Sequence, residues 1–228
     1  MSKYKILAVT LARAGSKGIK NKNIKKISGK PLIYYTIKEA LKCNLISDYI
    51  VSTDSKHISN ISKKFGARVP FLRPKKYSTD SASSVSALKH AVLWMERENN
   101  MKYDFIIELM CTNPLKKVKD IDEIIKKIVD TNADSVIAVH KLEDHHPIRI
   151  KKIVNDKIVN FILKEIPETR RQDLKPDAFI RSGSIYALKR KHLMIEKLRY
   201  GSKNSRLYIL PENRAINIDT VADLYAAE

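Results

Sequence analysis

The segment ARAGSKG, residues 12–18, has the composition of a loop that binds anions. Glycines let backbone N–H groups approach anionic oxygens closely, and such turns form concave anion sites. Arg13, Ser16, Lys17 and Lys22 add a forked guanidinium donor, a hydroxyl and two ammonium groups. Together they suit a polyphosphate, and transfer at phosphorus is the chemistry that clustered cations would assist. The alternative is an ordinary surface turn with solvated lysines.

Neither common phosphate-binding fingerprint is present in this loop. Its spacing differs from the GxxxxGK[ST] of a P-loop and from the GxGxxG of a dinucleotide-binding fold. The loop alone would therefore leave a surface turn as the simpler interpretation. The elements that position it, and the motifs further along the chain, must decide between the two.

Apolar and amphipathic segments alternate through the first part of the chain. Runs typical of strands buried on both faces lie at 4–11, 48–54, 103–110 and 134–142. Helical spacing or helix-start signals lie at 31–43, 55–66, 81–98 and 120–131. This order predicts an α/β fold with an open, mostly parallel sheet and helices on both of its sides.

Polar loops follow several of these strands. They are ARAGSKG at 12–18, STD at 52–54 and CTNPLK at 111–116. The carboxyl ends of parallel strands meet at one edge of a sheet, and ligands of such sheets bind beyond that edge. We therefore expect these loops to gather around one site.

The pattern changes after residue 142. A hairpin is expected around Asn155 and Asp156, and an irregular charged segment follows it. We interpret 143–180 as a lobe inserted in a single domain, 1–228, and this lobe either covers the site or meets a second subunit. Its apolar alternation favours a two-fold homodimer, and the residues concerned are Ile153, Ile158, Val159 and Ile162.

The chain is strongly basic. It has 44 Lys and Arg against 25 Asp and Glu, which gives a formal net charge of +19. Basic surfaces attract nucleic acids by releasing counterions from phosphates. Here the lysines are spread over most expected elements without interleaved aromatic residues, so we expect no nucleic-acid partner and a few charges focused on a small anionic substrate. A basic nucleic-acid-binding protein is the alternative from a different class.

Cysteine use and the N-terminal segment predict a soluble cytoplasmic protein without membrane attachment. Cys43 and Cys111 are the only cysteines, and neither has a partner at metal-ligand spacing. The first apolar stretch is far shorter than a membrane span and runs directly into the fold. We therefore expect neither a signal peptide nor an anchor.

The ordered motifs resemble the CMP-sialic acid synthetases, also called acylneuraminate or nonulosonate cytidylyltransferases. The matches run from ARAGSKG and GKPLIYYTI through VSTD, LRP, TDSASS and NPL to RRQDL, SGSIYAL and INIDTVADL. The resemblance implies a three-layer α/β/α nucleotidyltransferase fold, Rossmann-like in its mostly parallel sheet, with a small dimerisation lobe. It also implies a Mg²⁺-dependent transfer from CTP to a nine-carbon keto-sugar acid, which yields pyrophosphate and a CMP-sugar for surface glycans.

The same resemblance assigns roles to individual residues. Those expected to bind the nucleotide are Ala12, Arg13, Gly15, Ser16, Lys17, Lys22, Asn23, Arg73 and Ser84, and Arg13, Lys17 and Lys22 among them would be catalytic. Those expected to bind the sugar acid are Met110, Arg171, Gln172 and Tyr186. Asp219 and Asn217 would hold Mg²⁺. No general base stands out, and a metal-bound water or the metal-coordinated substrate hydroxyl would serve instead.

Two departures from the family pattern affect the substrate and the metal. Met110 stands where the family usually has Gln, and Met forms no comparably strong hydrogen bond. This favours legionaminic acid or a related nonulosonic acid, with N-acetylneuraminic acid or an eight-carbon ulosonic acid as alternatives. Asn217 stands where an acid is frequent, and its amide oxygen can bind Mg²⁺ without adding charge.

Other polar residues have structural explanations. The adjacent His145 and His146 would point to opposite faces of a strand, and no third ligand lies at metal-binding spacing. Asp54 ends a strand, where it can touch substrate or metal or else cap the next helix. Glu165 and Glu168 resemble the acids of a glycosidase only in type, and salt bridges within their basic loop explain them more simply.

Overall fold

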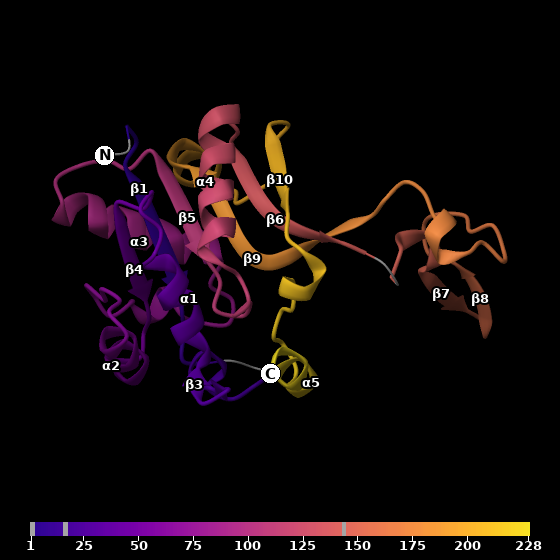
Figure 1. Ribbon diagram of the computed structural model, residues 1–228, viewed down its shortest axis with the longest axis horizontal. Coiled ribbons are helices and arrows are strands. Elements are labelled where there is room, and N and C mark those ends of the chain that lie inside the picture. The colour runs from indigo at the N-terminus through magenta and orange to yellow at the C-terminus, as the bar shows by residue number, and fades with distance from the viewer. Residues whose placement is uncertain (1–2, 16–17, 143–144) are drawn as a thin grey trace.

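A single sheet of 6 strands, in the order β10-β6-β9-β5-β1-β4, organises the chain (Figure 1). The computed structural model describes residues 3–15, 18–142 and 145–228. The strands of this sheet are β1 (Ile6–Leu11), β4 (Asp48–Ser52), β5 (Phe105–Leu109), β6 (Ser135–Lys141), β9 (Phe179–Lys189) and β10 (Ser205–Ile209). Two short strands, β2 (Lys26–Ile27) and β3 (Lys30–Pro31), form a separate ribbon.

Most strand pairs in this sheet are parallel, as the sequence predicted. β1 pairs in parallel with β4 and β5, and β10 pairs in parallel with β6. The exception is β9, which runs antiparallel between β5 and β6. The chain leaves the sheet at the carboxyl end of β6 and re-enters at that same edge, so the returning strand must run in the opposite direction.

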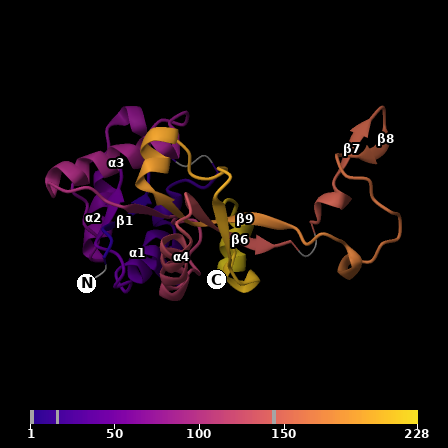
Figure 2. The same ribbon diagram turned by 90° about the horizontal axis from the view of Figure 1, so that it is seen from above.

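Helices cover both faces of the sheet, which gives the expected three layers (Figure 2). One face is packed by α1 (Leu32–Ala40), α2 (Lys56–Lys64) and α4 (Val118–Thr131). The other face is packed by α3 (Ser84–Glu98) and the π-helical segment His192–Glu196. The side chains of Ser55 and Ser83 cap α2 and α3, and Gly66 follows α2 with a φ of 91°.

The C-terminal helix α5 (Val221–Ala227) returns to the beginning of the fold. A small apolar cluster joins Ile218 and Leu224 from this end to Ile19, Ile27 and Leu32. Thr220 caps α5, and the Thr220 backbone N–H donates in return to the Asp223 carboxylate. The last residues of the chain are therefore fixed beside the loop that follows β1.

Residues after β6 form a lobe that projects from the sheet (Figures 1 and 2). Its hairpin consists of β7 (Lys151–Val154) and β8 (Lys157–Asn160), and Ile153 pairs with Ile158. The turn residues Asn155 and Asp156 have φ values of 49° and 61°, as a two-residue hairpin turn requires. Several apolar side chains of the lobe are exposed, and these are Ile153, Val154, Ile158, Val159, Phe161, Ile162, Leu163 and Ile166.

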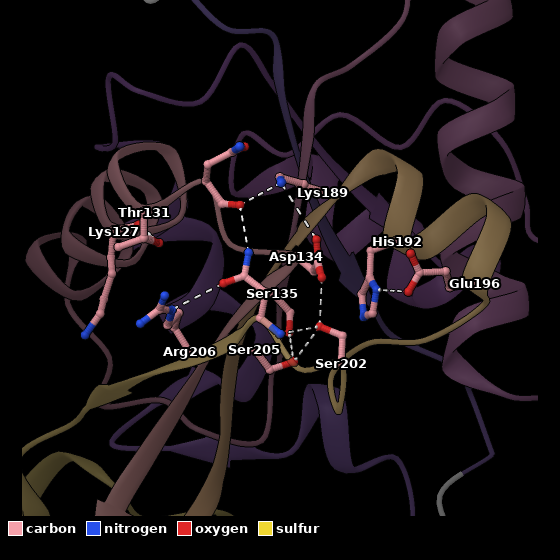
Figure 3. Close-up of polar contacts among 12 residues, drawn as sticks. Lys127, Thr131, Asp134, Ser135, Lys189, His192, Glu196, Ser202, Ser205 and Arg206 are labelled. Carbon is pink, nitrogen blue, oxygen red and sulfur yellow. Dashed lines mark hydrogen bonds and ion pairs between the residues drawn. The ribbon is translucent and has the colours of Figure 1, made fainter.

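A polar cluster ties β10 to the amino end of β6 (Figure 3). Ser202 donates from its hydroxyl to Asp134 at 2.9 Å, and the hydroxyls of Ser135 and Ser205 lie 2.9 Å apart. Lys189 Nζ donates to the Asn132 carbonyl at 2.6 Å. These groups bond to one another at the sheet edge opposite the polar loops, so their role is to fix strand positions.

The two thiols and the helix lengths bear on the expectations from the sequence. Cys43 and Cys111 are both free and buried. Within residues 3–15, 18–142 and 145–228, no helix combines the length and apolar character needed to cross a membrane.

Candidate active site

A cavity of about 380 Å³ opens beyond the carboxyl ends of β1 and β5, beside the start of α3. Its lining combines cations, hydroxyls, two carboxylates and a few apolar groups. The lining residues are Leu11, Arg13, Gly18, Lys22, Asn23, Arg73, Tyr77, Thr79, Ala82, Ser83, Ser84, Ala87, Glu108, Met110 and Asp219. This cavity is called the cleft below, and it lies at the edge where the sequence predicted a site.

Hydrogen bonds from neighbouring strands fix the loop after β1. The Ala12 N–H donates to the Ser52 carbonyl at 3.0 Å, and the Ala14 N–H donates to Asp54 Oδ1 at 3.0 Å. Asn23 Nδ2 donates to the Arg13 carbonyl at 3.0 Å. Ala12 is fully buried and does not line the cleft, so its contribution is to position the loop.

Asp54 and the glycines of this loop have distinct structural roles. Asp54 holds Ala14, and the cap of α2 is Ser55, so helix capping by Asp54 was the wrong alternative. Gly18 packs so closely that a Cβ there would lie 2.7 Å from the Asp219 carbonyl oxygen. Gly15 lies near the Arg13 guanidinium and outside the lining of the cleft. The predicted residues Ser16 and Lys17 lie outside the described residues.

Three cationic side chains converge on the cleft. Arg13 pairs with Asp80, and Lys22 Nζ donates to Asp219 Oδ1 at 2.8 Å. Arg73 is 5% exposed and donates from Nε to Ser78 Oγ at 3.1 Å. Burial lowers the pKa of Arg73, although an arginine remains charged at neutral pH. Three cations thus line the cleft where the sequence predicted nucleotide binding.

Asp219 and Asn217, which the sequence predicted to hold Mg²⁺, lie side by side, but Asn217 points its amide nitrogen to Asp219. Asp219 is more than half exposed at its side chain and lines the cleft, so its carboxylate fits a Mg²⁺ ligand. Asn217 donates from Nδ2 to Asp219 Oδ2 at 2.6 Å. Its Oδ1 is buried without a hydrogen-bond partner and faces Gly183. Asn217 would therefore have to rotate its amide to present oxygen to a metal shared with Asp219.

The predicted sugar-binding residues are divided between separate places. Met110 lines the cleft, whereas Tyr186 is buried in β9, opposite Glu108 of β5. Arg171 and Gln172 line a small cavity of about 50 Å³ in the lobe. Within one chain the structure therefore brings Met110 to the nucleotide residues and leaves Arg171 and Gln172 apart from them.

Sequence reasoning missed several residues that line the cleft, above all Glu108. It lies in the apolar run FIIELM, and a carboxylate inside a strand expected to be buried on both faces was the available signal. Glu108 is 0% exposed, and Arg199 donates to its Oε2 from Nη1 at 2.7 Å. Desolvation raises the pKa of Glu108, and Arg199 partly offsets that effect.

A second missed residue, Lys116, holds the turn after β5. Its ammonium is fully buried and donates to Thr36 Oγ1 at 2.8 Å, to the Met110 carbonyl at 2.7 Å and to the Asn113 carbonyl. Burial lowers the pKa of Lys116 to about 8. Asn113 in turn donates to the Ile216 carbonyl at 3.1 Å, which ties this turn to the segment that carries Asp219.

The polar residues of the lobe form contacts within the lobe itself. His146 Nε2 lies 2.8 Å from the Pro176 carbonyl, and its Nδ1 accepts from the Ile148 N–H. Across the described ranges, no group of three or more His, Cys, Asp and Glu side chains is arranged to hold a metal ion. Glu165 forms ion pairs with Arg149 and Lys151, as the salt-bridge explanation predicted.

Comparison with solved structures supports the fold. A CMP:2-keto-3-deoxy-manno-octonic acid synthetase complexed with CTP aligns with a TM-score of 0.69 at 21% identity, over 98% of this chain and 96% of that one. A 4-diphosphocytidyl-2C-methyl-D-erythritol synthase from Anaerococcus prevotii aligns with a TM-score of 0.63 at 14% identity, over 97% and 95% of the two chains. The fold is thus an α/β nucleotidyltransferase fold, as the resemblance implied.

Sequence comparison gives relatives along nearly the whole chain. A pseudaminic acid cytidylyltransferase of Campylobacter jejuni is 31% identical over 98% of this chain and 95% of its own length. A CMP-N,N'-diacetyllegionaminic acid synthase of the same species is 31% identical over 98% of this chain and 93% of its own length. Residues 7–201 match the family described as cytidylyltransferase. The chain belongs to the cytidylyltransferase family.

Proposed function

We propose that this protein transfers the cytidylyl group of CTP to a nonulosonic acid and releases pyrophosphate. The observation that carries the proposal is the cleft, in which Arg13, Lys22 and Arg73 converge beyond the parallel strands of a cytidylyltransferase chain. A hydroxyl of the sugar acid would attack the α-phosphorus in line, and the bond from that phosphorus to the bridging oxygen of pyrophosphate would break. The products are a CMP-sugar, pyrophosphate and the proton of the attacking hydroxyl, which passes to solvent.

The cations of the cleft suit the charge of this reaction. Negative charge builds on the leaving pyrophosphate, and catalysis of such transfers depends mainly on positioning and electrostatic stabilisation. Arg13 offers a forked donor for phosphate oxygens, while Lys22 supplies a compact charge. The buried Arg73 and the hydroxyl-rich start of α3 at Ser84 would hold the base and sugar of the nucleotide.

Magnesium is the proposed cofactor. Asp219 would hold it, and Asn217 would join after its amide rotates so that Oδ1 points to the cleft. When bound, the ion would neutralise phosphate charge next to Lys22. Lys22 now occupies one oxygen of Asp219, so ion binding would release the lysine toward the phosphates.

The proposed acceptor is a nonulosonic acid such as legionaminic acid. Relatives that match nearly the whole chain are named for pseudaminic and for N,N'-diacetyllegionaminic acid, and both support this class. Met110 forms an apolar part of the cleft wall, which favours a less hydroxylated acid over N-acetylneuraminic acid. N-acetylneuraminic acid and an eight-carbon ulosonic acid are the alternatives to be compared. The CMP-sugar would be made in the cytoplasm and used for surface glycans.

The lobe is the proposed contact between two copies in a homodimer. Ile153 and Ile158 are 80% and 75% exposed, and isolated hairpins rarely leave such pairs uncovered. Arg171 and Gln172 lie in this lobe, away from the cleft of their own chain. A two-fold dimer would let the lobe of one protomer reach the cleft of its partner, where Arg171 would pair with the carboxylate of the sugar acid.

Pyrophosphate release tests the proposed reaction. The purified protein is incubated with CTP, Mg²⁺ and, in turn, pseudaminic, legionaminic, N-acetylneuraminic and eight-carbon ulosonic acids, and then with other nucleoside triphosphates. We expect release with CTP and at least one nine-carbon acid. Absence of release with every acid, together with tight and salt-sensitive binding of RNA, would instead support a nucleic-acid-binding protein.

A further inference from the structure

Glu108 places a carboxylate where a strand would ordinarily carry an apolar side chain. Its neighbours across the sheet are Val9 of β1 and Tyr186 of β9, and all three strands are buried. Glu108 and Met110 are alternate residues, so they face the same side of the sheet, toward α3, and both line the cleft. A buried carboxylate in this position lowers stability unless both of its oxygens find donors.

Only one of those oxygens has a donor within the described part of the chain. Arg199 binds Oε2 at 2.7 Å, whereas Oε1 is buried and has no hydrogen-bond partner. Arg199 is itself fixed, because its guanidinium lies 4.6 Å from the ring centre of Tyr186. The ring of Tyr200 lies 6.2 Å from that of Tyr186 and carries Arg181 at 4.5 Å from its centre. The carboxylate is therefore held in one orientation in the wall of the cleft, with Oε1 buried and unpaired among the described residues.

The charge of this arrangement suits an anionic ligand. Arg199 balances Glu108, so the carboxylate does not repel a negatively charged sugar acid as an unpaired one would. Met110 follows Glu108 by two residues on the same face of the sheet, and its side chain forms no strong hydrogen bond. Of these two residues, Glu108 is therefore the one that can form strong hydrogen bonds with a ligand in the cleft.

We propose that Glu108 is a specificity-determining residue for the acceptor, and that its Oε1 accepts a hydrogen bond from an amide N–H or hydroxyl of the sugar acid. Arg199 acts as a positioning residue that fixes Glu108. This inference rests on the proposed function and goes beyond it, because it names the group that selects the acceptor. A buried acceptor left without its donor disfavours ligands that lack that donor by large factors.

Steady-state kinetics of Glu108→Gln tests this role. In the variant, Arg199 would keep the amide oxygen, so the NH₂ group would meet the donor of the sugar acid. We expect the KM of the acceptor to rise by about tenfold or more, because a donor of the protein would then face a donor of the sugar acid. The KM of CTP should change less than about twofold. Glu39→Gln is the matched control, because Glu39 is a buried carboxylate of α1 outside the cleft.

Acceptor analogues separate direct contact from a structural effect. In each analogue, one hydroxyl or one acylamino group of the acid is replaced by hydrogen. The wild type should lose about tenfold or more in kcat/KM with one analogue, and Glu108→Gln should no longer distinguish that analogue from the parent. Arg199→Lys should give a smaller loss in the same pattern. A uniform loss across all analogues would overturn the direct contact.

The outcomes distinguish this inference from the proposed function. If the wild type releases no pyrophosphate with any acid, the proposed function fails and the role of Glu108 fails with it. If the wild type is active and Glu108→Gln leaves the acceptor KM unchanged, only the role of Glu108 fails. A change in the preference for CTP over UTP, with acceptor selectivity intact, would assign Glu108 to the base and overturn the inference.

Discussion

Lys22 Nζ lies 2.8 Å from Asp219 Oδ1 and 3.1 Å from the Ile218 carbonyl oxygen. These residues are separated by nearly the whole chain, yet they meet at the mouth of the cleft. The cation predicted to bind phosphate and the carboxylate predicted to bind metal are thus one ion pair. The pair keeps both side chains in place in the absence of ligands, and the proposed reaction requires them to exchange partners.

Lys22→Ala should reduce kcat by about a hundredfold or more, because a preorganised charge next to the leaving pyrophosphate would be lost. Pyrophosphate release measures the rate, and thermal unfolding checks that the variant is folded. Lys26→Ala is the matched control, since Lys26 is an exposed lysine of β2 that does not line the cleft. Near-normal kcat in Lys22→Ala would remove this residue from the mechanism.

Asn217→Asp should strengthen Mg²⁺ binding. The new carboxylate would replace the amide that now donates to Asp219 at 2.6 Å, so two like charges would repel until a cation joins them. We expect a lower Tm than the wild type without metal and a larger gain in Tm when Mg²⁺ is added without CTP. Asp219→Asn should lose most of the Mg²⁺ response. An equal response in all three proteins would contradict a metal site at these residues.

Lys116 should make stability depend on pH in alkaline solution. Its pKa is about 8 in the folded protein, against 10.5 for an ordinary lysine, because burial disfavours the charged form. Below pH 8 both states hold the proton. Between about pH 8 and 10.5 only the unfolded state holds it, so this residue's contribution to the free energy of unfolding rises with pH.

The test compares wild type with Lys116→Met by urea unfolding from pH 7 to pH 10. The free energy of unfolding of the wild type should rise by up to about 3 kcal/mol relative to that of the variant between the folded and unfolded pKa values of Lys116, most of it above pH 8. Lys126→Met, which removes an exposed lysine of α4, is the control and should show a constant difference. A constant difference for Lys116→Met as well would show that the buried ammonium keeps its proton throughout.

Ile158→Lys should convert the proposed homodimer to monomers. A charged side chain at the centre of the exposed hairpin would oppose burial against a second copy, while the pairing of β7 with β8 would persist. Analytical ultracentrifugation measures the mass. Leu41→Lys changes an exposed leucine of the main body and should leave the mass unaffected. A monomeric wild type would contradict the dimer.

Complementation tests whether the lobe of one protomer completes the cleft of its partner. Inactive Lys22→Ala and Arg171→Ala proteins, mixed and allowed to exchange subunits, should regain about a quarter of the wild-type rate, because half of the random dimers have one intact site of two. No recovery after confirmed exchange would contradict a site built from two chains.

The sequence by itself determined the local elements and the chemistry of the first loop. Period and composition predicted the parallel strands, the hairpin at Asn155 and Asp156 and the helix at 120–131, since each depends on neighbouring residues. The ordered motifs also led to the family. Arg13, Lys22, Asn23, Arg73, Ser84 and Asp219, named from those motifs, all line the cleft.

Tertiary structure alone decided which groups face one another. Local pattern could not show that β9 inserts antiparallel, that Asp54 holds Ala14, or that Asn217 presents its amide nitrogen to Asp219. Glu108 is the clearest case, because its orientation depends on Arg199, far along the chain. Hydrogen bonds and desolvation act over a few ångströms in space, and only the folded chain sets those distances.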